Sequence, residues 1–129
     1  MQFLADTVAI IRHFAQIGKI GSAAKSILRD ADNEKNTIWI SIISIVEILY
    51  LSERNKIPLD FEALRHKLRS LDNYGIVDLD LGIVETAKNV QGLELHDRLI
   101  VSTALFLNIP MLTSDQTIKN CNLIDVIWE

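Results

Sequence analysis

The chain is poor in the residues that mark several large protein classes. Its 129 residues include one cysteine (Cys121), two prolines and five glycines, and only 6% of them are aromatic. A single cysteine excludes an internal disulfide framework and fits a reducing compartment, so we expect the protein to be cytoplasmic. The low proline and glycine content excludes collagen-like and low-complexity chains.

Long hydrophobic runs and an excess of positive charge are also absent. The longest apolar run, residues 37–51, is shorter than the roughly 20 residues that a bilayer requires, and it contains Glu47. The first residues lack the basic start of a secretory signal, so no membrane association is expected. The formal net charge is −4, which is unlike a typical DNA-binding protein. Any contact with phosphate groups therefore has to come from a local patch.

The remaining composition, 49% hydrophobic and 23% charged, predicts one compact domain over residues 1–129. Short β-type runs alternate with runs of helical spacing. Strands are predicted at residues 2–5, 37–40, 75–78, 110–113 and 123–127. Helices are predicted at residues 8–16, 22–30, 42–51, 61–71, 82–90 and 97–107, with Ser22 and Ser41 as caps. This alternation favours a three-layer α/β/α fold with a central parallel sheet.

Four acidic residues stand at positions where chemistry is expected. Asp6 follows the first predicted strand and Asp115 follows the fourth, so both would lie at the same edge of a parallel sheet. Asp97 opens a predicted apolar helix and Glu47 lies inside another. Taken singly, each aspartate could be only a helix N-cap, and Glu47 could belong to a capping box that begins at Ser44.

Glu47 is the hardest of the four to explain structurally. The apolar run starts before Ser44, so Ser41 is the better cap, and no Lys or Arg lies within one turn of Glu47. A carboxylate in such a helix is costly unless it is paired or coordinated. Four carboxylates that converge require a multivalent cation, and oxygen-only ligands favour Mg²⁺ or Mn²⁺ over Zn²⁺. Such a centre suits metal-assisted phosphodiester hydrolysis.

Four short motifs extend this prediction. They are Asp6-Thr7, Ser41-x-x-Ser44-x-x-Glu47-Ile48, His96-Asp97-Arg98-Leu99-Ile100-Val101 and Leu112-Thr113-Ser114-Asp115. In this order and spacing the chain resembles the PIN-domain family nearly end to end, specifically the VapC-like toxins of toxin–antitoxin modules. The resemblance implies a parallel sheet flanked by helices and an Mg²⁺- or Mn²⁺-dependent endoribonuclease. It also implies a homodimer and a small antitoxin protein as partner.

The resemblance also implies roles for individual residues. Asp6, Glu47, Asp97 and Asp115 match the acidic quartet of the family. Thr7 and Thr113 match polar residues that support the first and fourth acids, and Ser44 lies one turn before Glu47 as a hydrogen-bonding partner.

Glu94 lies where some relatives carry another acid, and it either extends the metal shell or is a solvated surface charge. Val8 departs from the family pattern, because many relatives have a small polar residue there. That difference removes one contact with water or phosphate but no metal ligand.

The substrate would be single-stranded or looped RNA, whose splayed backbone can reach a recessed site. Arg12, Arg54 and Arg98 are candidates for holding it, although Arg98 could instead pair with Glu94 or Asp97. The histidines lack metal-ligand spacing and are expected at the surface or in caps, with His96 of interest because it adjoins Asp97.

Two other functions remain open. An aspartate-based phosphoryl-transfer domain also carries an Asp after its first strand, but the phosphatase pattern needs a second Asp at the position of Val8. The acidic pair and late Lys of a receiver domain are not found either. A catalytically weak PIN-like domain that binds RNA or protein would be supported by a missing acid, whereas all four are present.

Overall fold

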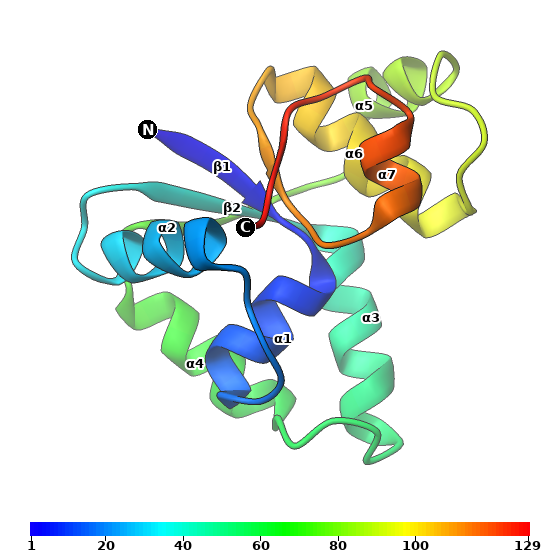
Figure 1. Cartoon of the computed structure of the whole chain (residues 1–129). Helices are drawn as coiled ribbons and strands as arrows, with labels where there is room; N and C mark the ends of the chain where they lie inside the picture. The colour runs from blue at the N-terminus through cyan, green and yellow to red at the C-terminus, as the bar shows by residue number, and fades with distance from the viewer.

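The protein is built around a five-stranded parallel sheet with helices on both faces (Figure 1). The computed structural model describes all residues, 1–129. The strands are β1 (Gln2–Ala5), β2 (Thr37–Ser41), β3 (Tyr74–Val77), β4 (Met111–Leu112) and β5 (Val126–Ile127). They lie in the order β3-β2-β1-β4-β5, and every neighbouring pair is parallel. The predicted three-layer α/β/α fold is confirmed.

Every predicted helix is present, with shifted ends, and one helix was not predicted. The helices are α1 (Thr7–Ala15), α2 (Ser22–Asp32), α3 (Ile42–Glu53), α4 (Phe61–Ser70), α5 (Leu81–Ala87), α6 (Leu95–Leu107) and α7 (Gln116–Asn120). Helix α7 is the unpredicted one. The expectation that Ser22 caps α2 is wrong: Gly21 is the N-cap and provides no side-chain hydrogen bond. Ser41 does cap α3, since its side chain accepts from the Ile43 N–H.

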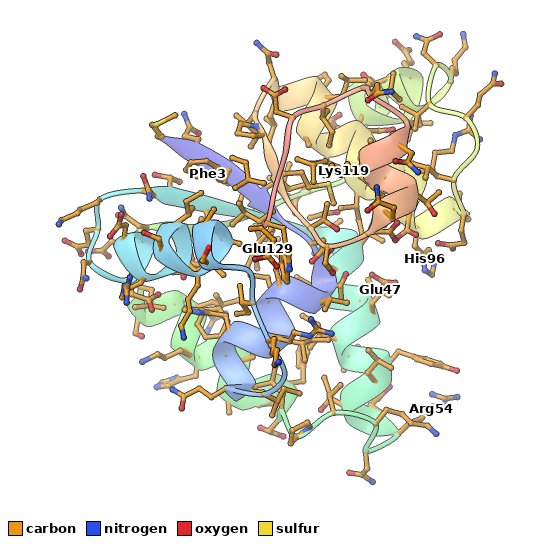
Figure 2. All side chains as sticks on the ribbon, in the orientation of Figure 1. Phe3, Glu47, Arg54, His96, Lys119 and Glu129 are labelled. Carbon is orange, nitrogen blue, oxygen red and sulfur yellow. The ribbon has the colours of Figure 1, made fainter.

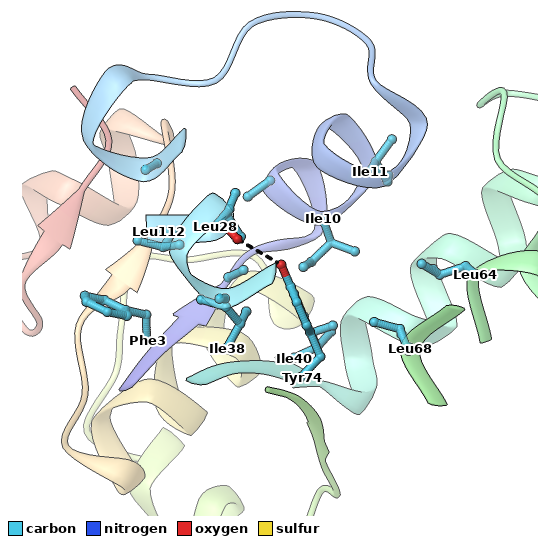
Figure 3. Close-up of a cluster of buried hydrophobic side chains, with 14 of the residues drawn as sticks. Phe3, Ile10, Ile11, Leu28, Ile38, Ile40, Leu64, Leu68, Tyr74 and Leu112 are labelled. Carbon is cyan, nitrogen blue, oxygen red and sulfur yellow. Dashed lines mark hydrogen bonds between the residues drawn. The ribbon is translucent and has the colours of Figure 1, made fainter. Parts of the chain in front are cut away.

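The two faces of the sheet bury separate apolar clusters, because successive residues of a strand point to opposite faces. Phe3 and Ala5 of β1 face the larger cluster, which includes residues of α1, α2 and α4. Figure 3 shows part of it, with Ile10, Leu28 and Ile38 beside Tyr74. Leu4 faces the smaller cluster, which includes residues of α6. The sheet therefore fixes β1 at the centre of the molecule.

Helix α3 is less covered than its sequence predicts. Only Ser44 and Ile48 of this helix are buried. Val46, Leu49 and Tyr50 are exposed by 54%, 37% and 52%, so one apolar face of α3 has no covering element within the chain. The helix is thus buried on one side and exposed on the other, although its residues are mostly apolar. None of the helices combines the length and the apolar character that a membrane span requires.

Candidate metal centre

The four acids meet where the strand order reverses. The chain runs from β1 through β2 to β3 on one side and resumes at β4 on the other side of β1. In open parallel sheets, ligands bind beyond the carboxyl ends of the strands at such a point. Asp6 follows β1 and Asp115 follows β4, and a single pocket there is lined by Asp6, Glu47, Asp97 and Asp115. The spatial convergence that the sequence suggested is present.

Asp6 lies at the bottom of this pocket, 9% exposed. Its Oδ1 accepts from the Ala9 N–H at 2.8 Å, which caps α1, and its Oδ2 accepts from Thr113 Oγ1 at 2.5 Å. Burial raises the pKa of Asp6 to about 6; the two hydrogen bonds partly offset this, and the charges of Asp115 and Asp97 raise it further. The surrounding protein therefore disfavours the negative charge of this carboxylate.

Asp97 and Asp115 present free oxygens to the same pocket. The side chain of Asp97 makes no hydrogen bond or ion pair within the protein, and burial followed by repulsion from Asp115 raises its pKa. Asp115 caps α7, but both capping bonds, from the Thr117 and Ile118 N–H groups, use Oδ1 alone. Both residues therefore keep oxygen atoms for a ligand.

Glu47 is held from two sides. Thr7 Oγ1 lies 2.5 Å from Glu47 Oε1 and 2.9 Å from Ser44 Oγ. His96 Nδ1 lies 3.5 Å from Glu47 Oε2, and Figure 2 shows the two residues beside each other. The side chain of Glu47 is 28% exposed, so the expectation that it lies in a helix with little polar surface is wrong, whereas its partners do come from other elements. An exposed helix face and a histidine contributed by α6 account for the difference.

A family model identifies the domain. The model described as "PIN domain" matches residues 3–122, which is nearly the whole chain. The chain belongs to the PIN-domain family. PIN domains are nucleases, and they generally use divalent metal ions.

Solved structures of other PIN-like chains share the fold. The chain is similar to VapBC2 from Rickettsia felis, solved bound to a DNA fragment from their promoter, with a TM-score of 0.74, 19% identity and 100% of both chains covered. It is also similar to FitAcB from Neisseria gonorrhoeae, with a TM-score of 0.69, 16% identity and 97% and 96% of the two chains covered. A third similar structure is VapBC-5 from Mycobacterium tuberculosis, a member of the VapBC family of toxin–antitoxin systems. Its TM-score is 0.63, its sequence identity is 14%, and 98% of this chain and 97% of that chain are covered. A search of curated protein sequences finds no match.

Two of the three expected supporting hydroxyl groups, those of Thr7 and Ser44, have other partners than those expected, whereas Thr113 contacts the fourth acid as expected. Thr113 binds Asp6 and also accepts from the Asp115 N–H at 3.0 Å, so it joins the first and fourth acids. Thr7 contacts Glu47 instead of the first acid, because it points from α1 across to α3. Ser44 contacts Thr7 and has no direct hydrogen bond to Glu47.

Glu94 caps α6, a role that the sequence had left open for Asp97. Its carboxylate accepts from the His96 N–H at 2.9 Å and the Asp97 N–H at 3.2 Å, and these bonds lower its pKa. Helix α6 begins at Leu95, so Asp97 lies within its first turn and its side chain is free. Glu94 is exposed and does not line the acid pocket.

None of the three predicted arginines lines the acid pocket. Arg98 forms no pair with Glu94 or Asp97; its Nε donates to the Ala87 carbonyl at 2.9 Å and ties α6 to α5. Arg54 lies over the Tyr50 ring at 3.8 Å, at the C-terminal end of α3 and away from Glu47 (Figure 2). Arg12 lines a different pocket, between α1 and α2.

The chemistry of the donors fits a hard divalent cation. The charged and hydroxyl donors that line the pocket are all oxygen atoms, no imidazole or thiol lines it, and its one sulfur is the thioether of the buried Met111. No three His, Cys, Asp or Glu side chains approach closely enough to form a finished ligand cage. Mg²⁺ commonly binds through one or two carboxylates and keeps several waters, so it does not need such a cage. A structural Zn²⁺ ion, in contrast, needs a closed tetrahedral cage of protein ligands.

Proposed function

We propose that this PIN domain is an Mg²⁺- or Mn²⁺-dependent endoribonuclease and the toxin of a toxin–antitoxin pair. The observation that carries the proposal is the state of Asp6. It is a buried carboxylate with a pKa raised to about 6, and it faces Asp97 and Asp115 in one pocket at the strand-order reversal. A group of this kind gains most from a bound cation.

Each acid has a proposed part in holding the ion. Asp6, Glu47 and Asp97 would hold one cation, and Asp115 would complete the site or help to hold a second ion or its waters. Thr113 and Thr7 orient the oxygens of Asp6 and Glu47 through the hydrogen bonds described above. When bound, a divalent ion would supply a nucleophilic water and neutralise charge on the phosphate in the transition state.

RNA is the proposed substrate because of the place of the acids. Asp6 lies at the bottom of a pocket that is bordered by α1, α3, α6 and α7. A single-stranded or looped backbone can enter such a recess, whereas a regular duplex keeps its phosphates on a wide, stiff cylinder. The family resemblance favours the same substrate class.

The partners are proposed from the structural relatives and from α3. The similar chains come from the toxin–antitoxin structures described above, and we infer a small antitoxin for this protein. The uncovered apolar residues Val46, Leu49 and Tyr50 offer a surface for a homodimer. With its single cysteine, the protein is proposed to act in the cytoplasm.

The test is cleavage of a structured RNA by wild type and by Asp6→Asn, each with Mg²⁺, with Mn²⁺ and with EDTA. Loss of the charge at Asp6 should lower the rate by on the order of 10²-fold or more, and EDTA should abolish cleavage. Asp60→Asn is a matched control, because Asp60 is also an N-cap aspartate, on α4, outside the pocket. Undiminished cleavage by Asp6→Asn, or in EDTA, would contradict the proposal.

A further inference from the structure

A second pocket, between α1 and α2, carries a concentration of positive charge. Its polar lining comes from Arg12, His13 and Gln16 of α1 and its C-terminal end, and from Lys25, Arg29 and Asp32 of α2. Although the chain has a net charge of −4, the lining of this pocket contains three permanent cations and only one carboxylate. That carboxylate is already engaged: Asp32 accepts from Tyr74 Oη at 2.7 Å and lies 3.0 Å from His13 Nε2.

The cations themselves have no acidic partner. Arg12, Lys25 and Arg29 form no salt bridge anywhere in the protein. Lys25 and Arg29 are exposed and one turn apart on α2, an arrangement in which like charges repel. An anion between α1 and α2 would offset this repulsion.

Arg12 is held in place by the turn that joins the two helices. Its Nη1 donates to the Lys19 carbonyl at 2.8 Å. A Cβ at Gly18, whose φ is +63°, would lie 3.0 Å from Arg12 Nε, so the bare glycine leaves room for the Arg12 side chain beside the turn. The N–H groups that remain have the planar geometry that suits a phosphate.

The acid pocket and the basic pocket border neighbouring sides of α1 at successive turns of the helix. Val8 lines the acid pocket and Arg12 lines the basic one, and the two residues are one helical turn apart on the same face. Arg12 is six positions after Asp6 in the chain, which is about 9 Å along the helix axis. A strand with one phosphate at the acids can therefore lie along α1 and bring a nearby phosphate to Arg12.

We infer that the pocket formed by Arg12, Lys25 and Arg29 binds a backbone phosphate of the RNA strand, one or a few nucleotides from the bond that is cut. This inference rests on the proposed ribonuclease function. An RNA phosphate is favoured over an acidic peptide because Arg12 lies one turn of α1 beyond Val8, which lines the acid pocket. The contact supplies local positive charge that the composition as a whole lacks.

The test is binding of a single-stranded RNA of about 12 nucleotides to Asp6→Asn protein in EDTA, over a range of salt concentrations. The double variant Lys25→Gln/Arg29→Gln in that background should bind about tenfold more weakly, and the slope of log K against log salt should shrink by about 0.7 for each phosphate that the variant no longer neutralises. Lys67→Gln/Lys88→Gln is the matched control, since both lysines are exposed and line neither pocket.

Equal slopes for the double variant and its control would overturn the inference. So would unchanged RNA binding together with weaker binding of an acidic peptide, which would assign the pocket to a protein partner. The proposed nuclease function fails separately, if the wild-type protein leaves RNA uncut with Mg²⁺ and Mn²⁺. The binding experiment does not depend on cleavage.

Discussion

Asp6 shows how much one side chain does in this fold. The same carboxylate caps α1, accepts the Thr113 hydroxyl and faces the other acids. The hydrogen bonds stabilise its charge, but burial opposes that charge more strongly and leaves the pKa at about 6. In the metal-free protein, Asp6 is thus a source of instability at neutral pH.

The pH dependence of stability follows from this shift. The pKa of Asp6 rises from 3.8 to about 6 on folding, so the native state binds more protons than the unfolded state between these values. Its contribution to stability is present below pH 4 and is lost as the pH rises through 6, by on the order of 3 kcal/mol. Urea unfolding in EDTA at pH 4 and pH 7 should show wild type losing stability relative to Asp6→Asn.

Bound Mg²⁺ or Mn²⁺ should reverse the loss at pH 7 in wild type, because the cation binds the ionised carboxylate. Asp6→Asn should respond less to the same ions. A stability difference between the two proteins that is independent of pH would argue against the shifted pKa.

At the scale of residues, the sequence predicts where the acids lie better than it predicts which side chains contact them. Asp6 and Asp115 could be placed together because both follow strands of a parallel sheet, and this depends only on the order of elements. Which hydroxyl contacts which acid depends on side-chain direction across two helices, as with Thr7 and Glu47. The approach of His96 to Glu47 likewise depends on how α6 packs against α3.

At the scale of elements, hydrophobic periodicity predicts the long helices. It does not predict very short helices, the capping residues or which helix face is exposed. Helix α7 has five residues, which is too short for a repeat of 3.6 to be visible. Helix α6 begins at a glutamate cap, which is a weaker sequence signal than Ser, Thr or Asp. The apolar sequence of α3 could not indicate its open face, because exposure depends on which elements pack against it.

The contact between α5 and α6 gives a test of the role of Arg98. Its Nε bonds the Ala87 carbonyl, at the end of α5. Arg98→Met keeps the aliphatic stem and removes this bond, so it should lower the free energy of unfolding by about 1 to 2 kcal/mol. Its KM for RNA should match that of wild type, whereas a raised KM with unchanged stability would restore the predicted substrate contact.

Arg54→Met is the matched substitution for this experiment. It removes only an exposed stacking contact with Tyr50, worth about 0.5 to 1 kcal/mol. Urea unfolding of both variants and of wild type should therefore show a larger loss of stability for Arg98→Met than for Arg54→Met.

At the scale of the whole molecule, the segment that follows β5 packs against the start of α2. The Ala24 N–H donates to the Trp128 carbonyl at 3.0 Å. A Cβ at Gly21 would lie 2.1 Å from that carbonyl oxygen, which is backbone and cannot move alone. The glycine is therefore required by close approach of two chain segments.

Gly21→Ala should destabilise the protein by about 2 to 3 kcal/mol, because the added methyl group forces α2 and the segment after β5 apart. Gly92→Ala is the control: nothing lies within 4 Å of its Cβ position, and only its positive φ of 82° is unfavourable, at roughly 1 kcal/mol. Equal losses for the two variants in urea unfolding would contradict the close contact.

The position of β1 between β2 and β4 has a consequence for synthesis of the chain. A ribosome-bound chain that has emerged only through α6 contains Asp6, Glu47 and Asp97, but β1 still has an open edge where β4 belongs. The hydroxyl of Thr113, 107 residues from Asp6, is not yet present to bind it, and neither is Asp115. The order of translation thus delays assembly of the acid pocket until the final strands are made, and a nascent chain of this length carries only three of its four acids.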